Sequence, residues 1–464
     1  RSSEQSQSKN MAASLATLRE ELSGNETKLG KEHPETLTSL YNLANLHRTQ
    51  GKIELAEPLY QQCLDGRRKV LGEDHPDTLT TTNNLAVLFY AQGKLAEAEP
   101  LFQQCLALKR QVLGPDHSET LSSMSNLASL LKKQGKVAEA EPLYQQCLAV
   151  RKKVLVPGHP DTLMAMNNLA NLFYAQNRLA EAEPLYQDCL AVQKLVLGPD
   201  HPKTLLSMNN LAYLFEAQGK LGAAETLYQQ CLAVEMKGSG PGHPDTLATM
   251  NNLANLLQKQ GKLGEAKPLF QQCLAGRKKV LGPDHPHTLA TTNNLAGLLE
   301  KQSKGAEAEP LYQRCLEGFT TVLGPDHPKT LISMNNLADL FFAQNKLAEA
   351  KLLYQQCLEV RKKVLGPKHP DMMASIGNLA VLLLSMYNYA SILAKKGDLV
   401  EAEIQARHSL EGHVSLGQTT IGRHPEHMKT NVKHCAAQLV GILCAQGKDE
   451  EAVVVEQTYN RYNN

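Results

Sequence analysis

The sequence predicts an all-α solenoid of antiparallel helix pairs, on three observations. Residues recur with a period of 42 along most of the 464-residue chain. Each period contains two apolar stripes with helical spacing, and in most periods a glycine separates them. No stretch shows the strict alternation of apolar and polar residues that a β-strand would give. A fixed period of this size is typical of stacked arrays, in which each unit buries its apolar face only against its neighbours.

Three columns of equivalent residues define the period. The histidines that open each unit are His33, His75, His117, His159, His201, His243, His285, His327 and His369. The cysteines are Cys63, Cys105, Cys147, Cys189, Cys231, Cys273, Cys315 and Cys357. The asparagines, which form the asparagine column, are Asn42, Asn84, Asn126, Asn168, Asn210, Asn252, Asn294, Asn336 and Asn378. Because stacked units share one continuous surface, we expect function on that surface rather than in a single cleft.

The unit at residues 75–116 shows how each helix begins and ends. Pro76 suits the first turn of a helix, and apolar spacing carries that helix to about Gln92. Gly93 ends it in the left-handed conformation, and a second helix then continues to Leu113, where a Gly-Pro pair stops it. His75 lies in the loop between units, so we expect it to pack on or bond the next helix end.

The chain divides into five segments. Residues 1–10 are polar and are expected to form a disordered lead-in, and residues 11–32 align with the second helix of a degenerate unit that caps the stack. Eight regular repeats follow at 33–368. A ninth repeat with an insertion spans 369–423, and a degenerate C-terminal capping repeat spans 424–464.

Two departures from the period predict local changes. In the ninth repeat the Asn-Leu-Ala at residues 378–380 is echoed by the Asn-Tyr-Ala at 388–390, so its first helix is lengthened or interrupted before Gly397. In the unit at 201–242, the Gly-Ser-Gly that starts at Gly238 replaces Val-Leu-Gly. Glycine destabilises a helix interior by about 1 kcal/mol, so we expect this second helix to fray early and to act as a hinge.

Composition excludes several classes of partner. The chain has 48 basic and 47 acidic residues and a net charge of +1, which gives no general attraction to nucleic acid or to an anionic membrane. Its longest apolar stretch, Leu379 to Met386, is far shorter than the roughly 20 residues that span a bilayer. Eight of the ten cysteines fall in one column, so we interpret them as buried packing residues of a reducing, cytoplasmic environment.

The sequence predicts no catalytic residue, no metal and no cofactor. It contains no nucleophile–base–orienter spacing, glycine-rich phosphate loop, H-E-x-x-H or C-x-x-C. The column histidines lie one repeat apart, which is too far to share a metal ion. The one nonrepetitive group with ligand chemistry is His413, His424, His427, His434, Cys435 and Cys444. We interpret this group as a surface feature of the capping unit.

The run L-A-x-L-x-x-A-Q-G-K-x-x-E-A-E-x-L-[YF]-x-x-[AC]-L resembles the tetratricopeptide repeat. Leu85 and Ala86 match its Leu–small pair, Phe89 its first aromatic and Phe102 its second. The 42-residue version, with N-N-L-A followed by V-L-G-P-D-H-P-D, is similar to the repeats of kinesin light chains, and the resemblance covers residues 33–403. It implies a right-handed superhelical stack in which the asparagine column lines the concave groove.

The asparagine column is the leading candidate for a peptide-binding surface. Asparagine is a poor helix former, yet it recurs in the middle of the first helices, one residue before a leucine of the core. Its amide donates and accepts, so a row of amides can hydrogen-bond the backbone of an extended peptide. Positions three and six residues after the column vary between units, as a selective peptide reader would need. The alternative is that the amides bond neighbouring repeats and stabilise the stack, and the two roles are compatible.

Arg48 and Lys132 complete the predicted peptide-binding set. In the kinesin light chains that this chain resembles, an arginine at the place of Arg48 helps hold acidic cargo peptides, and the run L-H-R-T-Q-G-K matches. Lys132 and the lysine after it form the next basic cluster. Glu216, Glu300 and Asp339 would repel acidic ligands, so a site for acidic peptides is expected toward the N-terminal end.

The leading functional hypothesis is a non-enzymatic adaptor that binds extended peptide segments of partner proteins in its concave groove. The resemblance gives this hypothesis a specific form, a cargo adaptor whose partner is the kinesin heavy chain or a cargo protein. A second hypothesis is a structural scaffold or spacer that uses the outer face or the ends of the stack. A third is the sensor region of a larger multidomain signalling protein.

Overall fold

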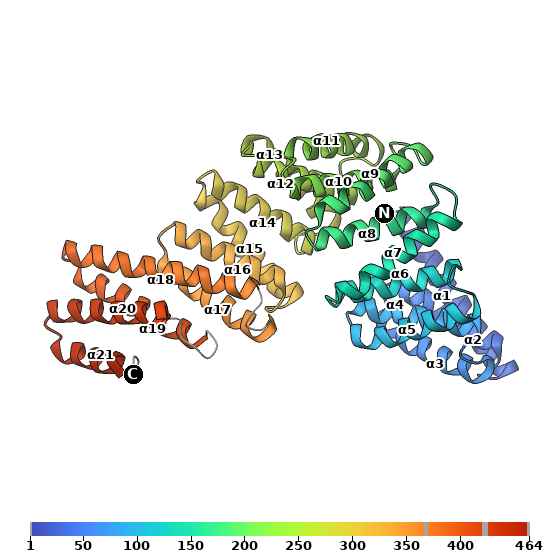
Figure 1. Ribbon diagram of the computed structural model, residues 1–464, viewed down its shortest axis with the longest axis horizontal. Coiled ribbons are helices and arrows are strands. Elements are labelled where there is room, and N and C mark those ends of the chain that lie inside the picture. The colour runs from blue at the N-terminus through green and yellow to red at the C-terminus, as the bar shows by residue number, and fades with distance from the viewer. Residues whose placement is uncertain (1, 366–369, 420–425, 462–464) are drawn as a thin grey trace. The chain divides into compact units, whose positions relative to one another are not determined.

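A computed structural model describes residues 2–365, 370–419 and 426–461 of the chain (Figure 1). These residues form 21 helices and no strand, which confirms the predicted all-α class. Helices that follow each other in the chain pack together, so each repeat contributes a first and a second helix.

Each first helix begins just after the loop between repeats, and each second helix begins just after the turn within a repeat. The first helices are α2 (Pro34–Thr49), α4 (Pro76–Gln92), α6 (Ser118–Lys133), α8 (Pro160–Ala175), α10 (Pro202–Ala217), α12 (Pro244–Lys259), α14 (Pro286–Lys301), α16 (Pro328–Ala343), α18 (Pro370–Lys396) and α20 (Glu426–Ala445). The second helices are α3 (Ile53–Leu71), α5 (Leu95–Val112), α7 (Val137–Val154), α9 (Leu179–Val196), α11 (Leu221–Gly238), α13 (Leu263–Leu281), α15 (Gly305–Leu323), α17 (Leu347–Leu365), α19 (Leu399–Thr419) and α21 (Asp449–Arg461). The helix α1 (Ser2–Leu29) precedes them.

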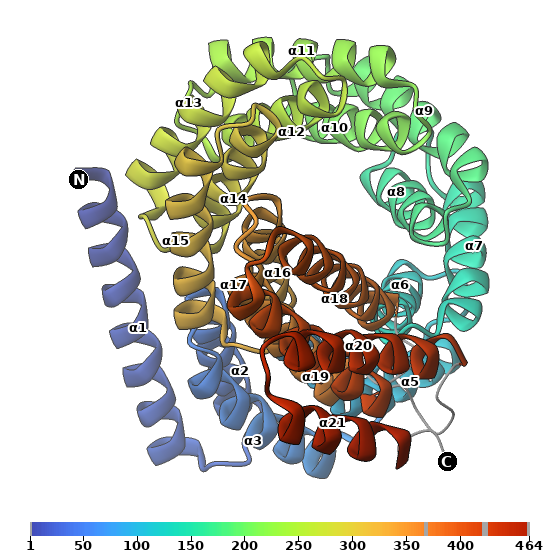
Figure 2. The ribbon, with the colours of Figure 1, turned by 90° about the vertical axis from the view of Figure 1, so that its left-hand side faces the viewer.

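The helices form two compact units, Arg1–Leu227 and Tyr228–Asn464. Consecutive first helices pack directly on one another: α4 on α6 in the first unit, and α12 on α14 and α14 on α16 in the second. Figure 2 shows α8 on the inner side of α7 and α9, and α14 on the inner side of α15. Within each unit the first helices therefore form the inner side of the stack and the second helices the outer side.

The column histidines cap the first helices. In eight repeats, Nδ1 of the histidine accepts a hydrogen bond from the backbone N–H two residues later, at 3.1–3.3 Å. Such a cap satisfies one of the free N–H groups of the first helical turn. The prediction that this column serves the helix ends is confirmed from His33 to His327, and His369 lies outside the described residues.

The column cysteines are buried packing residues, as predicted. All eight are free thiols without solvent exposure. The Cys63 thiol donates to the carbonyl of Leu37 at 3.2 Å, and the Cys273 thiol donates to that of Leu247 at 3.1 Å. Burial raises the pKa of the Cys63 thiol, which keeps the donor hydrogen in place.

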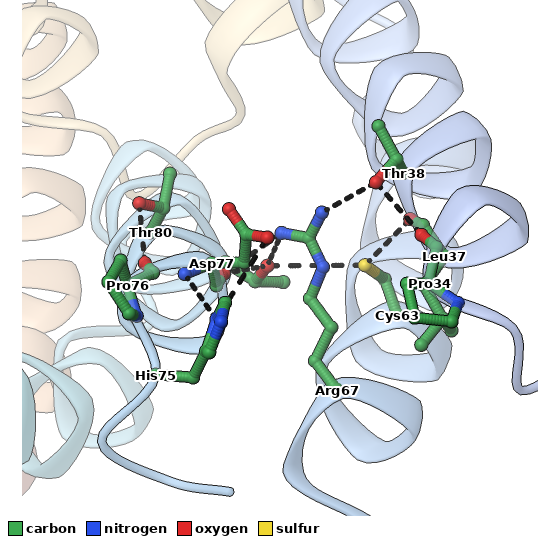
Figure 3. A network of polar contacts seen from close by, with 10 residues as sticks. Pro34, Leu37, Thr38, Cys63, Arg67, His75, Pro76, Asp77 and Thr80 are labelled. Atoms are coloured by element: carbon green, nitrogen blue, oxygen red, sulfur yellow. Dashed lines mark hydrogen bonds and ion pairs between the residues drawn. The ribbon is translucent and has the colours of Figure 1, made fainter. Parts of the chain in front are cut away.

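A buried column that the sequence analysis missed joins each second helix to the next repeat. The Nη1 atom of Arg67 donates to the carbonyl of Asp77 and to the hydroxyl of Thr81, each at 2.9 Å, while Nη2 lies 3.4 Å from the hydroxyl of Thr38 (Figure 3). Arg277 makes the equivalent two Nη1 bonds to the next repeat, to the carbonyl of His287 at 2.9 Å and the hydroxyl of Thr291 at 2.6 Å. Each guanidinium is thus bonded to the start of the following first helix.

The spacing of this arginine column was visible in the sequence but interrupted. Its arginines are Arg67, Arg151, Arg277 and Arg361, which lie two or three periods apart. The intervening repeats have Lys109, Gln193, Glu235 and Phe319 at the equivalent position. Because five residue types share the column, residue identity alone did not reveal it.

The predicted early fraying of the second helix at Gly238 is wrong. The helix α11 has 18 residues and reaches Gly238, so it is as long as α5, α7 and α9. The N–H groups of Ser239 and Gly240 bond the carbonyl of Glu235 at 2.9 and 3.0 Å. The glycines therefore close the helix end, where their flexibility costs little, and do not interrupt its interior.

The helix α1 differs from the prediction for the first residues. It begins at Ser2, so residues 2–10 are helical where the sequence predicts a disordered lead-in. The segment has no proline or glycine to stop a helix. Farther along, Leu22 packs on the core cluster of Leu37 and Leu40, and the Asn25 amide donates to the hydroxyl of Ser39 at 3.0 Å. This end of α1 covers the apolar face of the first repeat.

In the ninth repeat the insertion lengthens α18 to 27 residues without interrupting it, and Gly397 follows with φ of 88°. By length and composition alone, its segment Ala374–Lys396 could cross a membrane. Leu379, Leu382 and Leu383 of this segment are buried in one core cluster of the second unit. Core packing accounts for these leucines, whereas Val381, Leu384 and Ile392 of the same segment are exposed.

Candidate peptide-binding face

The exposed stripe of each first helix is the candidate site. We define the inner face as the column asparagine with the residues four before, three after and six after it, which lie on one side of the helix. On α10 these residues are Leu206, Asn210, Tyr213 and Glu216. The next two positions are constant, since a leucine and an alanine follow every column asparagine, and both are buried in each repeat from α2 to α16. A variable face thus lies beside an unchanging core.

Four column asparagines bond the preceding repeat. The amide nitrogens of Asn84, Asn126, Asn294 and Asn336 each donate to the residue that precedes the column asparagine of that repeat. The acceptors are, in the same order, Tyr41 Oη at 2.6 Å, Asn83 Oδ1 at 3.1 Å, Asn251 Oδ1 at 3.4 Å and Asn293 Oδ1 at 3.2 Å. This ladder between repeats is the stabilising role that the sequence left open as an alternative.

The other five column asparagines take no part in this ladder. They are Asn42, Asn168, Asn210, Asn252 and Asn378, and none of them forms a side-chain hydrogen bond with the residues that the structure describes. Peptide binding by the column stays a prediction. These five are the better candidates for binding a peptide, because their amide nitrogens do not donate to another described residue.

The position three residues after the column is tied to the second helix. Buried tyrosines of the second helix donate to it: Tyr60 to Asn45 at 2.6 Å, Tyr186 to Asn171 at 2.5 Å, and Tyr354 to Asp339. Where the second helix has Phe102 instead of tyrosine, the position is Val87, which needs no donor. Part of the variation that we interpreted as ligand selectivity therefore reflects packing within a repeat.

The two predicted cations lie on first helices of the first unit, Arg48 on α2 and Lys132 on α6. Nε of Arg48 donates to the hydroxyl of Tyr60 at 3.2 Å. Nζ of Lys132 donates to the carbonyl of Asn171 at 3.3 Å, and burial lowers the pKa of Lys132. Each cation thus uses a donor within the protein, and their role toward acidic peptides stays a prediction.

Two carboxyl groups mark the inner face of the second unit. Glu300 on α14 accepts from the hydroxyl of Tyr312 at 3.0 Å, and Asp339 on α16 accepts from that of Tyr354. Burial raises the pKa of both carboxyl groups, and the charge of Asp339 raises the pKa of Glu300 further. This part of the face is acidic and hydrogen-bonded to its own second helices.

The nonrepetitive histidine and cysteine group is only partly brought together. His413 and Cys435 are buried side by side, with Nδ1 and Sγ 3.6 Å apart, while His434 and Cys444 are exposed. His424 and the side chain of His427 lie outside the described residues. Within the described part of the chain, no three potential metal ligands lie close enough to hold an ion.

Family comparison agrees with this architecture. A family model described as the tetratricopeptide repeat matches residues 6–69, 49–111, 77–153, 119–194, 161–235 and 288–363, and a second model with the same description matches 246–287. The chain belongs to the tetratricopeptide repeat family. Such repeats form scaffolds for protein interaction, so the chain is an interaction scaffold, and no catalytic family is among these matches.

Several solved structures are similar to this chain. A putative kinesin light chain repeat protein of Podosopora anserina is 31% identical over 45% of this chain and 98% of its own, with a TM-score of 0.42. BtubC (BKLC) of P. vanneervenii is 22% identical over 51% and 93%, with a TM-score of 0.43. A tetratricopeptide repeat protein of Parabacteroides merdae is 18% identical over 65% and 98%, with a TM-score of 0.45. Among curated proteins, none matches the chain.

Proposed function

We propose that this protein is a non-enzymatic adaptor that binds extended peptide segments of partner proteins along its inner face. The observation that carries the proposal is the contrast between core and face. Leucine and alanine follow every column asparagine, whereas the position six residues later changes from Arg48 through Tyr174 to Glu300. Packing of the stack requires the constant residues, and it does not require this succession of charges and rings.

The affinity that such a face supplies follows from its hydrogen bonds. Each amide that bonds a peptide backbone contributes about 0.5–1.5 kcal/mol net. Several such bonds, less the ordering of the peptide, correspond to dissociation constants of roughly micromolar size. An adaptor of this strength holds partners reversibly, and the residues around the column select among them.

A cargo adaptor of the kinesin light chain type is the specific form of this proposal. The run L-H-R-T-Q-G-K around Arg48 supports it, and the partner is then the kinesin heavy chain or a cargo protein. The buried free thiols suit a reducing compartment, so we place this function in the cytoplasm. Binding of purified kinesin heavy chain tail to the protein tests this form separately.

A structural scaffold or spacer is the second candidate. The asparagine ladder favours it, because four column amides bond neighbouring repeats. In that case the inner face would hold no ligand, and partners would meet the outer face or the ends of the stack.

Peptide selection with a matched pair of variants separates the two candidates. Decapeptides selected from a random library against the unaltered protein are measured by fluorescence polarisation. Leu206→Glu alters the inner face, where this leucine is 61% exposed, and Leu195→Glu alters the outer helix α9, where the leucine is 87% exposed. The adaptor predicts a loss of about tenfold or more for Leu206→Glu, which is about 1.4 kcal/mol, and little change for Leu195→Glu. Failure to select any peptide, or equal effects of both variants, would support the scaffold instead.

A further inference from the structure

The row of residues four before the column asparagine changes character at α8 and α10. In the first three repeats this row is polar, and each hydroxyl donates to the carbonyl four residues earlier in its own helix, as at Thr38, Thr80 and Ser122. In the next two repeats the row has Met164, which is 47% exposed, and Leu206, which is 61% exposed. Two consecutive repeats thus place a large apolar side chain on the inner face where the preceding repeats have a small polar one.

These two repeats are neighbours in space as well as in sequence. The rings of Tyr174 on α8 and Tyr213 on α10 have centroids 5.2 Å apart, so the two helices pack side by side. Met164 and Leu206 have equivalent places on them, which puts their backbones about one helix spacing apart, roughly 8–10 Å. Single exposed apolar residues are common on protein surfaces. Two in one row of adjacent helices form a shared apolar surface, which we call the apolar pair.

The asparagine ladder is interrupted at these same two helices. The residue equivalent to the usual acceptor of Asn168 is Ser125, whose hydroxyl bonds the Cys147 sulfur at 3.1 Å. The equivalent for Asn210 is Asn167, whose amide nitrogen donates to a column cysteine. Within the described residues, the half-buried side chains of Asn168 and Asn210 have no hydrogen-bond partner. Each amide lies one helical turn from its member of the apolar pair and can bond a ligand there.

Together, the amides and the apolar pair favour an extended segment over a helix as the ligand. The N–H and C=O groups inside a helix already bond each other, so a helix offers the two amides few partners. A segment in the polyproline II conformation keeps its backbone groups free, with three residues per turn and a rise of about 3.1 Å per residue. Its side chains three residues apart lie on one side, roughly 9 Å from each other, which matches the spacing of neighbouring helices.

We propose that α8 and α10 carry a subsite for two large aliphatic side chains, three residues apart, of an extended partner segment. Met164 and Leu206 contact these two side chains, and the amide nitrogens of Asn168 and Asn210 donate to carbonyls of the same segment. This inference rests on the proposed peptide binding and specifies the side chains and the conformation of the bound segment.

The test uses fluorescein-labelled octapeptide pools that differ in their leucines, with mixed Ala, Ser, Thr and Gln at all other positions. One pool has leucine at its third and sixth positions, a second at its third and fourth, a third at its third position alone, and a fourth has no leucine. Binding to the full chain is followed by fluorescence polarisation. Because each contact buries apolar area, we expect the first pool to bind about tenfold more tightly than the fourth. The second and third pools should gain only about threefold, since one of their side chains reaches the apolar pair.

Variants that restore the polar residue of other repeats locate the preference. Met164→Thr and Leu206→Thr should each lower the affinity for the first pool by about threefold, to that of the single-leucine pool, and leave the leucine-free pool unchanged. Ile332→Thr is the matched control. Ile332 is 49% exposed in the same row of α16, where Asn336 donates to the preceding repeat, and this variant should bind every pool as the unaltered protein does.

A fifth pool, with two prolines between the leucines at positions three and six, tests the conformation. Proline disfavours a helix and favours polyproline II, and it keeps its carbonyl as an acceptor. This pool should bind at least as tightly as the first, and a loss of binding would assign the apolar pair to a helical ligand and overturn the proposal. If the pools bind without regard to leucine spacing, or if the preference survives in both threonine variants, the subsite is wrong while peptide binding stands. If no pool binds, both proposals fail.

Discussion

The inner face differs between α8–α10 of the first unit and α14–α16 of the second, although the same columns build both. On α16, Asn336 donates to the preceding repeat and Asp339 accepts from a buried tyrosine. On α10, Asn210 has no such partner among the described residues, and Tyr213 exposes its ring at the equivalent of Asp339. On α16 the column amide and the carboxylate both bond other groups of the stack, whereas on α10 the column amide does not and the tyrosine ring borders solvent.

The difference originates one residue before the column. Asn293 accepts from the asparagine of the next repeat, whereas Asn167 donates to the sulfur of Cys189 at 3.2 Å and its Oδ1 is buried without a partner. A single side-chain orientation thus decides whether the next column asparagine donates to the neighbouring repeat or keeps its amide out of the ladder. In an array of near-identical units, candidate binding sites are therefore expected where the hydrogen bonds between units change.

The largest expected effect concerns the buried arginine column, in which the two units should not differ. Arg67→Ala in the first unit and Arg277→Ala in the second each remove a charged donor from a carbonyl and a hydroxyl of the next repeat. We expect each variant to lower the free energy of unfolding by about 2–3 kcal/mol, measured by urea denaturation. The exposed Arg110→Ala on α5 serves as control, with an expected change below about 0.5 kcal/mol. Clearly unequal losses at Arg67 and Arg277 would show that the shared core does not stabilise both units alike.

A smaller effect should distinguish two members of the asparagine column. Asn336→Ala and Asn210→Ala gain the same helix propensity, and only Asn336→Ala loses a hydrogen bond to the preceding repeat. We therefore expect Asn336→Ala to be less stable than Asn210→Ala by about 1 kcal/mol in paired urea unfolding curves. Equal stabilities of the two variants would show that the asparagine ladder contributes nothing to the free energy of unfolding.

The smallest effect is the pH dependence that the carboxyl groups on the inner face of the second unit contribute. Burial raises the pKa of Asp339 above its ordinary value of 3.8, so protonation favours the folded state. This stabilisation is complete at low pH and is lost as the pH rises through the raised pKa, from about pH 4 toward neutrality. Glu300, whose pKa is raised as well, acts with the same sign, and Lys301 opposes it.

Asp339→Asn tests this dependence while keeping an acceptor for Tyr354, since Asn45 and Asn171 accept from tyrosines at the same position. The melting temperature of the unaltered protein should fall relative to this variant as the pH rises from about 4 to 7.5, since Asp339 loses its proton more readily in the unfolded chain. An identical pH profile for the two proteins would mean that Asp339 does not titrate in this interval.

Features that depend on one period of sequence were predicted well. The histidine caps, the glycine that ends α4 and the buried cysteines each involve a residue and a neighbour whose position the 42-residue spacing defines. The arginine column was not predicted, because lysine, glutamine, glutamate and phenylalanine replace arginine in four repeats. The hydrogen bond from Tyr60 to Asn45 was not predicted for a related reason. The two residues belong to different helices, and the residue types at these two positions vary between units.

By itself, the sequence determined the helix pairs, their caps and the apolar columns of the core, because helix formation and burial follow from local composition and a regular spacing. Only the tertiary structure decided which asparagines bond another repeat and which face solvent. Asn126 and Asn210 have the same place in the period, yet their states depend on how Asn83 and Asn167 orient their amides in the neighbouring helix. That orientation is a competition between hydrogen-bond partners of similar energy, which packing in three dimensions settles.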